Sequence, residues 1–444
     1  MKPVRRVFRI APQPRLAIAV AAVAPLWLVP GTAGTVLVAA GALALIVATA
    51  ADWLLLPPRD RLAIEREMPE AIGLGDSVEA RYVVTSRWKR DVIVRIADEL
   101  PPSIRGTVAE RGEVAVPAGQ DVTVAATLVG TRRGRHALGR VGWSARTRLG
   151  LLAAYWIGDP ADVVLVAPSV SGVRRFRLLA VQHRLHTAGV RALRRRGEGQ
   201  AFAGLREYAI GDDPRHVDWK ATARRNTLIT REYSIEQSQT VLTLVDAGRG
   251  MTQLAGEYPR FEHALSSALV LTDVAVAAGD HVGTLVFDDE VRAFVPPRRG
   301  HGALGAVRNA LIPVTATVKE PDYAAAFRYL ATHQRKRALV VFFTDVIDVR
   351  ASRALVAHVA RSAARHLVVI VAMRNDALVA KAHPAARTAL GTYESAAAEE
   401  LIMSREEALE RMRRAGAAVL DVSPSGMTAA VVNRYLEIKA RGAL

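Results

Sequence analysis

The feature that most restricts the fold is a set of five continuous apolar runs in the second half of the chain. Each run has the length of a β-strand, and stretches of helical character separate them. Uninterrupted apolar runs are typical of strands buried on both faces of a parallel sheet. Their alternation with helices predicts a doubly wound, Rossmann-like α/β domain over residues 239–444. The runs are Val241–Val245, Val282–Phe287, Ala338–Phe343, Leu367–Ala372 and Ala417–Asp421.

Two further apolar runs lie near the N-terminus. Residues 16–30 carry no charge, and residues 33–56 carry only Asp52. The second run is long enough for a hydrocarbon core about 30 Å thick, whereas the first falls below the usual minimum of about 17 residues. A signal peptide is the alternative for the first run, but a second span follows at once across a Pro-Gly turn. We therefore predict a transmembrane helical hairpin within residues 1–58.

The charges around this hairpin predict its orientation. Basic residues precede the first run and follow the second, while the turn between them is uncharged. Because positively charged flanks stay in the cytoplasm, we expect both termini and the soluble domains to be cytoplasmic, at the inner (plasma) membrane. Membrane lipid is then one expected partner.

Short alternating apolar runs fill residues 60–168. Val78–Val84 and Val122–Leu128 are examples, and turn signals separate such runs. This pattern predicts a small antiparallel β-sandwich, immunoglobulin-like in type. The segment has no recognisable catalytic grouping, so we interpret it as a spacer or interaction module.

The chain is strongly basic, with a formal net charge of +17, and it has no cysteine. The lack of cysteine excludes disulfides and zinc–thiolate sites. The strip Arg174–Arg196 is rich in arginine and could contact anionic lipid or nucleic acid. No aromatic platform or reader motif accompanies it, so we favour a solvated linker and expect no specific nucleic acid.

One segment combines charged, aromatic and turn-forming residues more densely than any other. Residues 197–225 read GEGQAFAGLREYAIGDDPRHVDWKATARR. Opposite charges this close tend to pair, which either fixes an internal conformation or presents a polar surface to a partner. The candidate partner-binding or structural residues are Glu198, Phe202, Arg206, Glu207, Tyr208, Asp212, Asp213, Arg215, Asp218, Trp219 and Arg224.

The spacing from Gly197 to Arg224 resembles the signature of the bacterial and archaeal domain of unknown function 58. The resemblance implies a membrane hairpin, a β-rich segment, a basic linker with this signature over residues 169–238, and a von Willebrand factor A-like domain. It also implies a partner, because such proteins are often encoded beside a MoxR-type AAA+ ATPase. It implies no particular reaction.

The same resemblance places a metal-ion-dependent adhesion site at the strand ends. The first loop of such a site reads D-x-S-x-S, but here both serine positions are glycine. Aspartates with water can still hold Mg²⁺, whereas Arg249 inside the loop can neutralise them instead. We expect a degenerate, unoccupied site in which Arg–Asp pairing replaces the cation, and no other cofactor. The candidate ligands are Asp246, Asp322 and Asp345.

The signature also permits an enzymatic interpretation. Asp212, Asp213, His216 and Asp218 lie within seven positions, which is enough for a two-metal hydrolase or an acid–base pair. Neighbouring arginines compensate these acids, which favours ion pairs, and the usual motifs of nucleotide-binding loops and hydrolases are missing. We therefore predict a non-catalytic adaptor or assembly factor. A hydrolase, and a binder of lipid or nucleic acid through the Arg-rich strip, are the alternatives.

Overall fold

The computed structural model describes residues 9–58, 60–106, 112–158, 160, 162–169, 201–209, 212–234, 239–346, 353–383 and 389–441. The chain divides into two compact units, Met1–Ser169 and Val170–Leu444, which are described separately. The strip Arg174–Arg196 and Glu198 lie outside the described residues.

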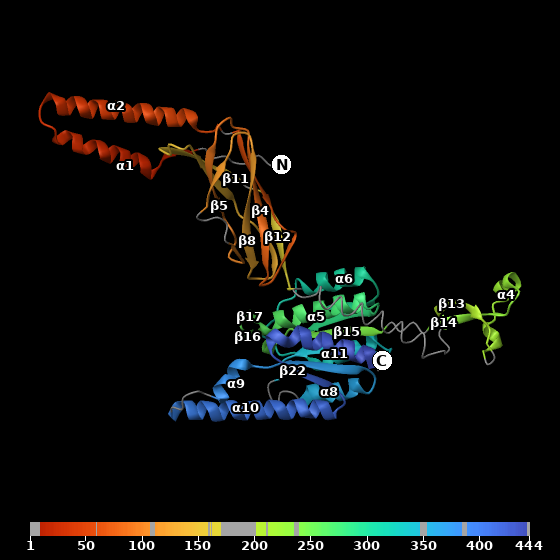
Figure 1. Cartoon of the computed structure of the whole chain (residues 1–444). Coiled ribbons are helices and arrows are strands. Elements are labelled where there is room, and N and C mark those ends of the chain that lie inside the picture. Colours follow the sequence, from red (N-terminus) through yellow and green to blue (C-terminus); the bar gives the residue numbers. More distant parts are fainter. Residues whose placement is uncertain are drawn as a thin grey trace. The chain divides into compact units, whose positions relative to one another are not determined.

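Two apolar helices project from the first unit (Figure 1). Helix α1 covers Pro14–Val23 and continues as the 3₁₀ turn η1, Ala24–Leu28, while α2 covers Thr32–Leu55. Within the described residues, α2 alone is long and apolar enough to cross a membrane. Of the two helices expected to span a membrane, one therefore has the necessary length and composition. Pro25 has no N–H to continue the α-helical ladder, which explains why α1 stops at Val23.

The rest of the first unit is β-structure, and most of its strand pairs are antiparallel. Buried and exposed positions alternate along the strands, as the sequence pattern predicts. A five-stranded sheet has the order β1 (Arg9–Pro12), β11 (Leu152–Gly158), β10 (Val141–Arg146), β5 (Val92–Asp98), β7 (Glu113–Val116). A four-stranded sheet has the order β2 (Leu62–Glu67), β4 (Ser77–Ser86), β8 (Asp121–Gly130), β6 (Ile104–Gly106). A three-stranded sheet has the order β3 (Ala71–Gly73), β12 (Val163–Ala167), β9 (Gly134–Ala137).

The signature segment folds into a small module of two strands and a short helix. Strands β13 (Ala201–Glu207) and β14 (Ile229–Ser234) pair antiparallel. Between them lie the 3₁₀ turn η2, Pro214–His216, and helix α4, Trp219–Arg225. Asn226, in the left-handed conformation at φ 56°, ends α4.

The second unit contains a six-stranded sheet in the order β19, β18, β15, β20, β21, β22. All five predicted apolar runs are strands of this sheet, and they are mutually parallel. The sixth strand, β19, is antiparallel to its neighbour and was not predicted. The strands are β15 (Thr240–Asp246), β18 (His281–Phe287), β19 (Val291–Arg298), β20 (Leu339–Thr344), β21 (Leu367–Met373) and β22 (Ala418–Val422).

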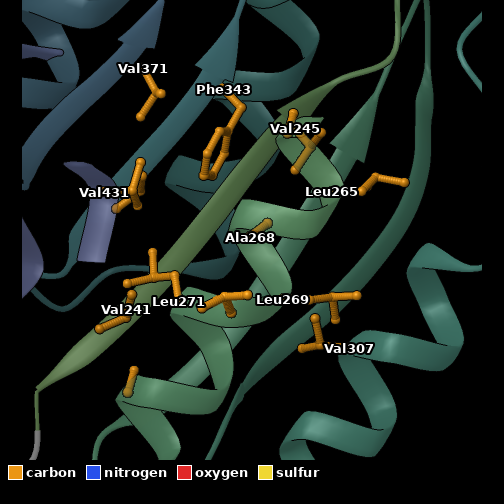
Figure 2. Close-up of a cluster of buried hydrophobic side chains, with 14 of the residues drawn as sticks. Val241, Val245, Leu265, Ala268, Leu269, Leu271, Val307, Phe343, Val371 and Val431 are labelled. Atoms are coloured by element: carbon orange, nitrogen blue, oxygen red, sulfur yellow. The ribbon is translucent and has the colours of Figure 1, made fainter. Parts of the chain in front are cut away.

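Helices cover both faces of this sheet. Val241 and Val245 of β15 pack in one core cluster with Leu265 and Ala268 of helix α5 (Arg260–Ala277), as Figure 2 shows. Leu242 and Leu244 of β15 pack in a second cluster on the opposite face. The first face is covered by α5, α6 (His301–Leu311) and α11 (Met427–Arg441). The second is covered by α7 (Tyr323–His333), α8 (Arg353–Ala363) and α10 (Ala389–Arg414).

Candidate functional site

The carboxyl ends of β15 and β20 form the first candidate site. These two strands are adjacent at the centre of the sheet, and the chain runs from β15 outward in both directions. Ligands of doubly wound sheets bind beyond the strand ends at such a switch point. Asp246 ends β15 and Asp345 follows β20, so the structure brings two of the three predicted metal ligands to this point.

Asp246 is 3% exposed and is held by neutral donors. The backbone N–H of Gly248 donates to its Oδ1 at 2.7 Å, and the Thr344 hydroxyl donates to its Oδ2 at 2.7 Å. The hydroxyl of Tyr323 lies 3.3 Å from the same Oδ2. Burial raises the pKa of Asp246 to about 6, although these hydrogen bonds oppose the rise. A charge on this carboxylate is therefore costly in the folded protein.

Asp345 forms a buried ion pair with Arg260, the first residue of α5. The Nη1 and Oδ1 atoms are 2.5 Å apart, and the two side chains are 4% and 5% exposed. Burial raises the pKa of Asp345, while the guanidinium groups of Arg260 and Arg405 lower it. Arg–Asp pairing at the strand ends was expected, but the arginine proposed for it was the wrong one. Arg249 instead pairs with Glu320 on the surface, at 2.7 Å.

The third predicted ligand, Asp322, has another role. It is exposed, and its side chain caps α7 by accepting from the backbone N–H of Ala325 at 2.9 Å. The acid that accompanies the site is Asp288, which directly follows β18, is fully buried and accepts from the Thr317 hydroxyl at 3.1 Å. Sequence reasoning missed it, although it follows a predicted strand just as Asp246 does.

These residues do not fit a Mg²⁺ ion. The Arg260 guanidinium already neutralises Asp345, and Asp322 is committed to its helix. Within the described part of the chain, no group of three or more His, Cys, Asp or Glu side chains is placed to hold a metal. A Cβ at Gly248 would lie 2.8 Å from Pro321 Cδ, and one at Gly250 would lie 3.1 Å from Asp345 Cβ. The two glycines therefore allow close packing, whereas a serine at Gly248 would force its surroundings to shift and one at Gly250 would press against Asp345.

The signature module is a second candidate site, and its acids are used locally. Asp212 pairs with Arg206 at 2.7 Å and accepts the backbone N–H of Ala209 at 2.9 Å. Its carbonyl oxygen accepts from the Tyr208 hydroxyl at 3.0 Å. These contacts close the turn that follows β13.

Asp218 secures the other side of the module. Its Oδ1 accepts from the backbone of Ala221 at 3.0 Å, which caps α4, and its Oδ2 pairs with Arg231 at 2.9 Å. The pKa of Asp218 is lowered, first by the backbone hydrogen bond of Ala221 and then by Arg231. Asp213 is exposed and accepts the backbone N–H of Arg215 at 2.9 Å, a turn contact rather than an ion pair.

Arg231 is thus a structural partner of the signature that the motif alone does not reveal, because it lies beyond Gly197–Arg224, on strand β14. The remaining predicted residues are distributed as follows. Glu207 and Arg224 are exposed, and the side chain of Phe202 lies outside the described set. Trp219, the first residue of α4, is 70% exposed, and the module also exposes Leu205 and Leu228.

A family model matches part of the chain. Residues 204–389 match the family described as "Protein of unknown function DUF58". This range begins in the signature module and includes Asp246, Arg260 and Asp345 of the strand-end site. The match agrees with the resemblance to this family for residues 204–389.

Two mycobacterial relatives are similar to this chain. Uncharacterized protein Rv1480 of Mycobacterium tuberculosis is 24% identical over 155 residues, which are 34% of this chain and 48% of that protein. Uncharacterized protein Mb1516 of Mycobacterium bovis gives the same values. The chain therefore spans about half the length of the curated relatives it matches.

Two solved structures align with a small part of the chain. Salmonella alpha-2-macroglobulin reacted with methylamine aligns with a TM-score of 0.18 at 17% identity, over 24% of this chain and 7% of that chain. The native conformation of E. coli alpha-2-macroglobulin aligns with a TM-score of 0.18 at 14% identity, over the same shares. Overlaps this small identify neither a fold nor a function.

Proposed function

We propose that this chain is a membrane-anchored cytoplasmic adaptor or assembly factor that is not catalytic and works with a MoxR-type AAA+ ATPase. The observation that carries the proposal is Trp219, a 70% exposed indole on a module whose conformation is fixed by its own ion pairs. Exposed aromatic side chains on rigid supports are the usual anchors of protein interfaces. The signature acids thus support a docking surface.

The charge of the same module indicates the kind of surface that it meets. Lys220, Arg224 and Arg225 are exposed on α4, the helix that begins at Trp219. An acidic patch on the partner would complement these cations and speed association. We infer that the ATPase offers an apolar pocket rimmed by Asp and Glu.

The α/β domain is, in this proposal, a von Willebrand factor A-like head. The strand order with one antiparallel edge strand supports it, and so does the position of Asp246 and Asp345 at the switch point. Arg260 occupies the electrostatic role that a cation would have at these acids. The β-rich segment is, by the same reasoning, an immunoglobulin-like sandwich that serves as a neck.

Membrane anchoring rests on the exposed apolar surface of the hairpin. Helix α2 has 24 residues and is almost wholly unburied, with large apolar side chains such as Leu43 and Ile46 directed outward. Water disfavours so much contiguous apolar surface, whereas lipid does not. Strand β1 precedes the hairpin and pairs with β11, which supports retention of this segment in the mature protein rather than cleavage as a signal peptide.

The test is capture of the purified ATPase by the full-length protein. We expect Trp219→Ala to reduce co-purification at least about tenfold, as loss of an interface anchor does, and to leave the thermal unfolding temperature unchanged. Tyr393→Ala is the matched control, because Tyr393 is also an exposed aromatic on a helix of the second unit, 78% exposed. Equal capture by wild type and Trp219→Ala would refute the docking role.

A hydrolase panel separates the enzymatic alternative. Asp212→Asn and Asp218→Asn keep the size of the side chains but remove the charges that a hydrolase would use. The wild type would then turn over a substrate, and the variants would lose that turnover but still capture the ATPase. This result would make the hydrolase, and not the adaptor, the function of the chain.

A further inference from the structure

The end of the spanning helix is fixed to the β-structure of the first unit. Asp52, the only charge in the apolar run, is fully buried at the end of α2. Its carboxylate accepts the backbone N–H groups of Leu151 and Leu152, each at 2.8 Å, and the hydroxyl of Thr147. A carboxylate with three donors leaves the helix little freedom to swing relative to the loop at residues 147–151.

The start of the hairpin is held by the same loop. The backbone N–H of Gln13 donates to the Leu151 carbonyl at 2.8 Å. The Arg15 guanidinium donates to the carbonyls of Arg148 and Leu149 at 3.1 and 3.3 Å. Both ends of the hairpin are thus attached to the loop between β10 and β11, without a flexible linker.

A second loop lies beside the helix end. The Trp88 indole N–H donates to the Leu55 carbonyl at 3.3 Å, and the Arg87 backbone N–H donates to the Arg61 carbonyl at 2.8 Å. Arg148 pairs with Asp91 at 2.9 Å, which joins this loop, residues 87–91, to the first one. These contacts gather four segments around the base of the hairpin: residues 13–15, residues 55–58 with 60–61, residues 87–91 and residues 147–151.

We call the exposed basic side chains of these segments the collar. Six described cations lie in the four segments, against two exposed acids, Asp60 and Asp91. Two apolar side chains suited to the membrane interface are near the collar in the chain: Leu149 follows Arg148, and Trp53 lies at the end of α2. Both are about half exposed. The collar cations are Arg15, Arg61, Arg87, Lys89, Arg90 and Arg148.

We propose that the collar binds the phosphate groups of anionic lipids and seats the β-structure directly on the membrane surface. This inference rests on the proposed anchor. The apolar stretch from residue 33 to residue 51 is about 28 Å long at 1.5 Å per residue, which matches a hydrocarbon core of about 30 Å. When α2 spans such a core, Asp52 and the collar lie at headgroup level, where guanidinium groups bind phosphate bidentately.

The test uses the full-length protein in nanodiscs that contain phosphatidylcholine with or without phosphatidylglycerol. Electron paramagnetic resonance of spin-labelled lipids gives the relative association of the two lipids with the protein. One basic contact near the surface corresponds to a preference of about fivefold, so we expect the wild type to prefer phosphatidylglycerol by at least about that factor. Added salt should reduce the preference.

The deciding variant is Arg87→Gln with Lys89→Gln and Arg90→Gln, which removes three exposed charges from one loop. It should lose most of the preference. A matched control, Lys220→Gln with Arg224→Gln and Arg225→Gln, removes the same charge from α4 and should keep it. Circular dichroism confirms that both variants fold.

Three outcomes would overturn the proposal. The first is a wild type that shows no preference between the lipids. The second is a collar variant that keeps the preference. The third is a collar variant that loses ATPase capture while its lipid preference stays unchanged. The last result would assign the collar to an acidic protein partner. Alkaline carbonate extraction of membranes tests the anchor separately. A chain that carbonate extracts contradicts the proposed function. A chain that remains in the membrane but shows no lipid preference contradicts the collar proposal alone.

Discussion

Replacing Asp246 by asparagine should make the α/β domain more stable at neutral pH. Burial raises the pKa of this carboxyl from 3.8 to about 6. The folded state therefore keeps its proton to a higher pH than the unfolded state does. As the pH rises through this window, ionisation favours unfolding, so the wild type loses stability between about pH 4 and pH 6.

The size of the effect follows from the shift. A difference of about two pKa units corresponds to roughly 3 kcal/mol of unfolding free energy. Asparagine is never charged, so the variant avoids this loss. Its amide oxygen can accept from Gly248 N–H, and its amide N–H can donate to the Thr344 hydroxyl oxygen. At pH 7 we expect Asp246→Asn to gain up to about 3 kcal/mol, or about 6–12 °C in unfolding temperature for a domain of this size. Near pH 4 the two proteins should be similar.

Hydrogen exchange of the β15 and β20 amides in the full-length protein measures this stability within the α/β domain. Thermal unfolding in detergent at pH 4 and pH 7 gives an independent value. Asp322→Asn is the matched control, because asparagine caps a helix as well as aspartate does and the residue is exposed. Two results would refute the reasoning: an Asp246→Asn variant that is less stable than the wild type at pH 7, or one that loses as much stability as the wild type does when the pH rises from 4 to 7.

Further predictions concern the same domain and the orientation of the chain. Arg260→Ala leaves Asp345 buried without a partner and should cost about 3–5 kcal/mol, whereas removing both side chains should cost less; urea unfolding of the single and double variants measures the difference. Asp280→Asn weakens the buried contact with the C-terminal helix, where the Tyr435 hydroxyl donates at 2.6 Å, and should increase hydrogen exchange in α11 and not in β21. Gly248→Ser with Gly250→Ser should lower stability by about 1–3 kcal/mol through overpacking and create no Mg²⁺ binding in calorimetric titration; tight binding would show that the loop opens to form a metal site. A reporter fused to the C-terminus should be active only if it functions in the cytoplasm, and periplasmic activity would reverse the proposed orientation.

The parallel strands could be predicted because a strand buried on both faces must be continuously apolar. Strand β19 could not, since Arg292, Pro296 and Pro297 interrupt its apolar character. Proline is tolerated there because β19 is an edge strand with a neighbour on one side only. The first apolar run is helical where a transmembrane helix was predicted, but the break at Pro25 leaves it too short to count as a candidate span.

The strand-end acids could be predicted for the same reason as the strands. Their partners could not. Arg260 reaches Asp345 because α5 packs across the sheet, and no local pattern in the sequence records that contact. Arg249 is the arginine nearest to Asp246 in sequence, yet its side chain pairs with Glu320 at the surface. In the signature, likewise, Asp218 before α4 pairs with Arg231 of β14 rather than with a neighbour in the motif.

Site-specific crosslinking in native membranes tests the central claim most directly. A photoreactive amino acid replaces Trp219 in the full-length chain, and a second protein carries it at Tyr393. After irradiation, the account predicts a crosslinked band that contains the MoxR-type AAA+ ATPase from position 219 and none from position 393. Absence of the ATPase from the products at position 219, with the protein folded and in the membrane, would contradict the proposal that the signature module is its docking site.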